Sequence, residues 1–68
     1  MDKIVLIKLS EDSRSILATV RLERVKGRKG LYNEYLGYES RQIITATDNV
    51  IGEINGHIRL GFTIKEIS

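Results

Sequence analysis

Basic side chains gather in one short segment of the chain, residues 21–30. This segment holds five basic residues against one acidic residue, although the formal net charge of the whole chain is only +2. The basic residues are Arg21, Arg24, Lys26, Arg28 and Lys29. Such a concentration of charge attracts anions over a Debye length of about 8–10 Å, so we expect an anion-binding site here.

Three tyrosines follow this segment, and they add the other group that nucleic-acid sites use. Basic side chains neutralise phosphates, and single-stranded bases stack on aromatic rings. The pattern predicts a nucleic-acid site made of Arg24, Lys26, Arg28, Lys29, Tyr32 and Tyr35. Arg41 and Arg59 would assist if their elements present them on the same face. The alternative is a solvated basic turn beside tyrosines that pack against a small core.

Side chains suited to nucleophilic catalysis or metal binding are scarce. The chain has no cysteine and a single histidine, His57. We interpret His57 as a solvated residue of a tight turn, because a lone histidine near Glu53 or Asp48 is a weak metal signal. A serine nucleophile would need that histidine as its base. The sequence therefore predicts no metal and no cofactor.

Carboxylates and glycines give no sign of an enzyme either. No apolar environment is evident around Glu34 or Glu39 that would turn either one into a general acid. Gly27 and Gly30 lack the spacing of a phosphate-binding P-loop, and no serine or threonine follows them. We predict a binding module that is not an enzyme.

The elements that carry these side chains are expected to be mostly strands. Isoleucine, which is β-branched, recurs along the chain. Residues 4–9 and 41–47 predict strands, the first of them central because it is apolar on both faces. Residues 16–25 alternate apolar and polar, which favours a strand, with a helix capped by Ser10 or Ser13 as the alternative.

The remaining segments are loops, turns and one ambiguous stretch. Residues 26–30 predict a loop whose two glycines adopt positive φ. Residues 31–37 fit a short helix, because apolar residues lie four apart, or an irregular strand. Asn55-Gly56 between apolar runs predicts a C-terminal β-hairpin. We favour a three-residue loop that pairs Ile54 with Ile58 over a two-residue turn.

Together these elements predict a mainly β protein with one small domain over residues 1–68. Four to five antiparallel strands would form a sheet or a small barrel with a C-terminal hairpin. A short chain buries only about 60% of its unfolded surface. Its open sheet edges invite pairing, so we expect a homo-oligomer.

Hydropathy and the N-terminal pattern bear on location and partners. No apolar run approaches the roughly 20 residues that cross a bilayer, and the N-terminal pattern lacks a signal-peptide layout. We therefore expect a cytoplasmic protein without a membrane partner. The alternative to nucleic-acid binding is an accessory, regulatory or inhibitory subunit, of the kind that phages and mobile elements encode. It would dock its basic loop on an acidic protein surface, or assemble with itself.

Overall fold

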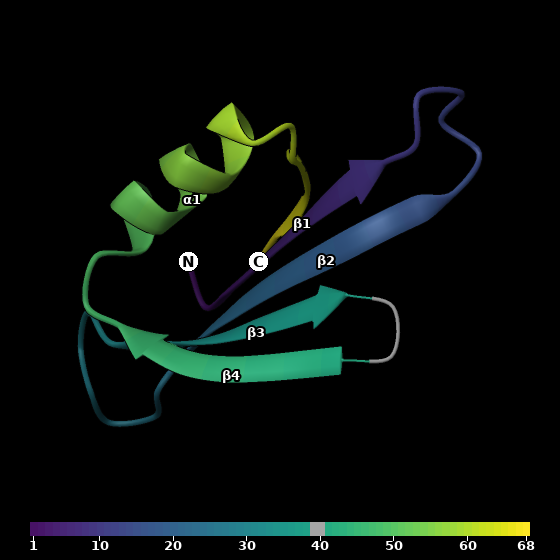
Figure 1. Ribbon diagram of the computed structural model, residues 1–68. Helices are drawn as coiled ribbons and strands as arrows, with labels where there is room; N and C mark the ends of the chain where they lie inside the picture. The colour runs from purple at the N-terminus through teal and green to yellow at the C-terminus, as the bar shows by residue number, and fades with distance from the viewer. Residues whose placement is uncertain (39–40) are drawn as a thin grey trace.

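Five antiparallel strands and one helix make up the structure, a computed structural model (Figure 1). It describes residues 1–38 and 41–68, and the side chains of Tyr38, Arg41 and Ile43 lie outside the description. The elements are β1 (Lys3–Leu9), β2 (Ile16–Arg24), β3 (Tyr32–Tyr38), β4 (Arg41–Thr47), α1 (Val50–Arg59) and β5 (Thr63–Ile67). The sheet order is β4-β3-β2-β1-β5, so the sheet is open and its edges are β4 and β5. The mainly β prediction is confirmed.

The core lies between one face of the sheet and α1, which covers that face (Figure 1). Strands β1 and β2 pair with Leu6 opposite Val20 and Ile4 opposite Leu22, and none of these four side chains is exposed. Ile54 of α1 and Phe62 after it complete this layer. The alternation that predicted a strand over residues 16–25 is thus confirmed, because every second side chain from Ala18 to Leu22 is buried.

Ile16, the first apolar residue of this alternation, is not part of the buried layer, since its side chain is 53% exposed. The register of β1 and β2 shifts between Lys8 and Leu9, just where Ile16 pairs with Leu9. The β1–β2 hairpin also extends beyond the end of α1 (Figure 1). This end of the hairpin therefore has no helix above it.

The predicted C-terminal hairpin is wrong, because Asn55 and Gly56 lie in the middle of α1. Asn49 caps this helix, and its Oδ1 accepts a hydrogen bond of 3.1 Å from the Gly52 N–H. Val50, Ile54 and His57 recur at helical spacing on the face of α1 that meets the sheet. Ile54 and His57 are buried, and Val50 is partly buried. Burial of that face outweighs the local turn preference of Asn-Gly, so neither predicted hairpin register occurs. No helix in the described ranges is long and apolar enough to cross a bilayer.

The helix considered for residues 31–37 is also wrong, because β3 occupies this stretch. It pairs with β2 on one side and β4 on the other. Both ladders use its backbone N–H and C=O groups, which a helix would bond within itself. A Cβ atom at Gly37 would lie 2.7 Å from Thr19 Oγ1, so this glycine lets β2 and β3 approach closely rather than ending a helix.

The two ends of the described chain meet in the sheet. Strand β5 pairs antiparallel with β1, which makes β1 an internal strand as predicted. The N–H groups of Asp2 and Lys3 both donate to the Ser68 carbonyl, at 2.6 and 3.1 Å. The first and last strands are therefore held side by side by backbone hydrogen bonds.

The cap of α1 gives a direct test of the helix. Asn49→Ala removes the hydrogen bond to Gly52 and should lower the free energy of unfolding by about 1 kcal/mol, measured by urea denaturation. Asn55→Ala is the matched control, because Asn55 is exposed in the middle of α1 and alanine is a good helix former. Equal destabilisation by both variants would contradict a helix that begins at Asn49.

Candidate functional site

The basic loop, defined here as Val25–Gly30, joins β2 to β3 through two consecutive turns. The Arg28 N–H donates to the Val25 carbonyl at 3.1 Å, and the Val25 N–H donates to the Leu31 carbonyl at 2.8 Å. Gly27 and Gly30 have φ angles of 78° and 80°, where a side chain would be strained. The predicted loop and its glycine conformations are confirmed.

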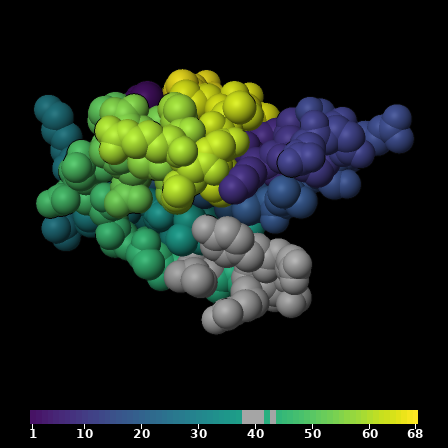
Figure 2. Space-filling view, turned by 45° about the horizontal axis from the view of Figure 1, so that its top comes forward, coloured from purple at the N-terminus to yellow at the C-terminus, as the bar shows by residue number. Residues whose placement is uncertain are grey.

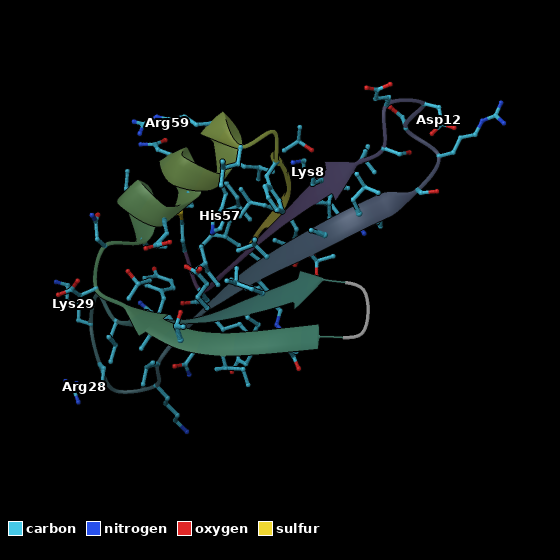
Figure 3. The ribbon with its side chains drawn as sticks, viewed as in Figure 1. Lys8, Asp12, Arg28, Lys29, His57 and Arg59 are labelled. Carbon is cyan, nitrogen blue, oxygen red and sulfur yellow. The ribbon has the colours of Figure 1, made fainter. Side chains whose placement is uncertain are left out.

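Three cations of this loop are free to meet a partner. Lys26, Arg28 and Lys29 are all exposed, and within the described ranges none of them forms an ion pair. Residues 24–29 line an open hollow. Figure 3 shows Arg28 and Lys29 pointing away from the sheet, and the loop projects from one end of the molecule (Figure 2). The tip is therefore a small, solvent-facing concentration of positive charge.

Arg24 and Tyr32, the two residues that flank the loop, lie differently. The Arg24 Nη2 atom is 2.5 Å from Asp2 Oδ1, so a neighbouring carboxylate partly neutralises its charge. Tyr32 is only 6% exposed, and its hydroxyl donates a 2.7 Å hydrogen bond to the Met1 carbonyl. Its ring therefore serves the core and offers no open face for a base.

Tyr35 lies on the opposite face of the sheet from Tyr32, because the two are three residues apart on a strand. The Arg21 guanidinium carbon is 4.4 Å from the centre of the Tyr35 ring, a cation–π contact. Arg59 lies in the last turn of α1, away from the loop (Figure 3). The Arg41 side chain is outside the described residues. The structure thus gathers Arg24, Lys26, Arg28 and Lys29, but not the tyrosines or Arg59.

A second charged site, the Glu34–Glu53–His57 cluster, lies between α1 and the sheet. Glu34 comes from the core face of β3, while Glu53 and His57 are four apart on α1. His57 Nε2 is 3.4 Å from Glu34 Oε1 and 3.8 Å from Glu53 Oε2. The Glu34 and His57 side chains are 6% and 11% exposed, and that of Glu53 is 41% exposed. Figure 3 shows His57 pointing from α1 toward the sheet.

This cluster overturns two expectations from the sequence. His57 is a buried helix residue rather than a solvated turn residue, and its ring packs edge-to-face on Phe62 with centroids 5.2 Å apart. Glu34 does have an apolar environment, because β3 faces the core at this position. The missed signal was the four-residue spacing of Glu53 and His57, which brings side chains together only on a helix.

Electrostatics set Glu34 apart from the exposed carboxylates. Burial raises the pKa of Glu34 because it penalises the charged form, and the nearby Glu53 carboxyl raises it further. His57 opposes this effect through its hydrogen bond and charge. Among the described residues Asp12 also has a shifted pKa, which is lowered because its carboxylate accepts hydrogen bonds from the Ser10 hydroxyl and the Arg14 N–H in the β1–β2 turn.

Comparisons with protein-family models, curated proteins and solved structures found no match. Function therefore has to follow from the residues of the two charged sites. The basic loop offers exposed positive charge to an anion. The cluster offers one imidazole nitrogen and two carboxylates whose ligand atoms all lie within 4.8 Å of one another.

The raised pKa of Glu34 predicts how stability depends on pH. Because the folded-state pKa lies above the ordinary value of 4.5, the contribution of this carboxyl to stability is fully present below pH 4.5. It is lost as the pH rises through the folded-state pKa. Glu34→Gln removes the ionisable group. The free energy of unfolding of this variant, relative to that of the parent, should therefore increase between pH 4 and pH 8.

Urea denaturation at a series of pH values, in the presence of a chelator, measures this difference. Glu11→Gln is the matched control, because Glu11 is exposed in the β1–β2 turn. The change of the Glu34→Gln difference with pH should exceed that of this control. A Glu34→Gln difference that changes no more with pH than that of the control would contradict the desolvation of Glu34.

Proposed function

We propose that this protein is a small, non-enzymatic module that binds nucleic acid through Lys26, Arg28 and Lys29 of the basic loop. The observation that carries the proposal is their exposure on a projecting tip, with no ion pair among the described residues. Long flexible cations neutralise phosphates without fixed geometry. Arg24 lines the same hollow and adds to the positive potential. Its ion pair with Asp2 reduces this contribution.

The kind of binding follows from the side chains present. Contacts from three loop cations to phosphates carry no sequence information, so recognition should be of the backbone rather than of bases. Tyr35 would contribute only if Arg21 left its ring. Three phosphate contacts imply a log–log salt slope of about −2 to −3.

A second candidate is a protein-interaction module, and the uncovered face of the sheet favours it. Helix α1 covers one face only, which leaves Leu17 and Ile44 on the other face 51% and 60% exposed. Such a surface, or the open edges β4 and β5, would suit a second copy of this chain or an acidic protein that also meets the loop.

Reversal of loop charges tests the first candidate. Arg28→Glu combined with Lys29→Glu should weaken binding to a fluorescent oligonucleotide at least tenfold at low salt and flatten the salt slope by about 2, measured by fluorescence anisotropy. Arg14→Glu combined with Lys65→Glu is the matched control. It changes the net charge equally at exposed positions away from the loop and should preserve the slope.

Circular dichroism and thermal unfolding would check that each double variant keeps its fold. Absence of binding by the parent at low salt, or binding that salt does not affect, would overturn the nucleic-acid proposal. Equal loss in both double variants would show an effect of net charge rather than a site. A stoichiometric protein partner that survives nuclease treatment would favour the second candidate.

A further inference from the structure

We propose that Glu34, Glu53 and His57 form a binding site for a divalent first-row transition metal ion, with Zn²⁺ as the best fit. The ligand atoms would be His57 Nε2 and one carboxylate oxygen from each glutamate. The ion would join α1 to β3. The site is separate from the basic loop, so the proposal does not depend on nucleic-acid binding.

The spacing of the ligand atoms fits the coordination shell of such an ion. Zinc binds imidazole nitrogen at about 2.0–2.1 Å and carboxylate oxygen at about 2.0–2.2 Å. Tetrahedral geometry then places neighbouring ligand atoms about 3.4 Å apart. The two distances from His57 Nε2 are 3.4 and 3.8 Å, and all three ligand atoms lie within 4.8 Å. Small side-chain movements suffice to close a shell around an ion.

The same distances are long for a cluster closed by its own hydrogen bonds. Charge-assisted contacts between nitrogen and carboxylate oxygen usually measure about 2.7–2.9 Å, shorter than either distance here. The imidazole of His57 therefore lies between two carboxylates and forms a short hydrogen bond with neither. A divalent cation would convert the repulsion between Glu34 and Glu53 into attraction to a common centre.

Burial gives an independent reason to expect a ligand at this place. The Glu34 side chain is 94% buried and points into the cluster from the core face of β3, where it meets His57 Nε2 at 3.4 Å and the neighbouring Glu53 carboxyl. The His57 ring is packed against Phe62, and its buried Nδ1 has no partner among the described groups. The other ring nitrogen, Nε2, faces both carboxylates. Buried charges need compensation, which a bound metal supplies.

Donor type and access narrow the choice of ion. Imidazole suits zinc, copper, iron and nickel, whereas calcium takes six to eight oxygen ligands that this cluster does not offer. The Glu53 side chain is 41% exposed, so solvent reaches the site past this residue. Three protein ligands leave a fourth position for water.

Position in the fold gives the proposal a readout besides binding itself. Glu34 and His57 are 23 residues apart in the chain and come from different elements. An ion that holds both favours the folded state by mass action. Zinc should therefore raise the unfolding temperature until the site is saturated.

The test uses the full chain without an affinity tag, stripped of metal with a chelator that is then removed. Calorimetric titration with ZnCl₂ should give one ion per chain, and Co²⁺ should give the visible absorption of a four- or five-coordinate site. Glu53→Gln and Glu34→Gln should each weaken zinc binding at least tenfold and shrink the rise in unfolding temperature. Glu11→Gln, in the exposed turn, should bind like the parent.

The Glu53→Gln variant keeps the test decisive if the change at buried Glu34 prevents folding, because Glu53 is partly exposed at the edge of the cluster. Absence of saturable zinc binding by the folded parent would overturn the proposal. Zinc affinity that Glu34→Gln and Glu53→Gln both retain would also overturn the proposal, because the ion would then bind elsewhere. Magnesium that binds as tightly as zinc would overturn the assigned class of ion.

Discussion

The helix α1 covers only one face of the sheet. The packing of α1 and Phe62 onto Ile4, Leu6, Val20 and Leu22 is the contact on which the rest depends. It fixes which side of each strand is buried, because side chains alternate between faces. That same packing buries Glu34 and His57 and leaves the far face and both sheet edges open.

The basic loop and the Glu34–Glu53–His57 cluster differ mainly in their exposure to solvent. Cations of the basic loop lie in water, where salt screens them and where they contribute little to stability. Charges of the Glu34–Glu53–His57 cluster lie under α1, where desolvation makes each of them more costly. The proposed anionic partner would therefore bind at the surface of the molecule, whereas the proposed metal ion would be held within the fold.

Patterns of neighbouring residues correctly predicted one strand and one loop. The period of two predicted β2, because burial of one strand face leaves its mark on neighbouring residues of the sequence. The two glycines predicted the loop between β2 and β3, because glycine adopts positive φ without strain. Asn55-Gly56 failed because α1 depends on the Asn49 cap and on burial of Ile54 and His57 against distant strands. The cluster was lost with it, since Glu53 and His57 meet only on a helix and Glu34 joins them only when β3 lies below.

The pairing of β5 with β1 has a consequence for biosynthesis. Strand β5 leaves the ribosome after β1, its partner in the sheet, and α1 and Phe62 also emerge after the β1–β2 hairpin. Until they arrive, the nascent β1–β2 hairpin has an open edge and an uncovered layer of Ile4, Leu6, Val20 and Leu22. The sheet and its core are therefore complete only when synthesis of these residues is finished. Until then the exposed apolar layer can associate with other chains.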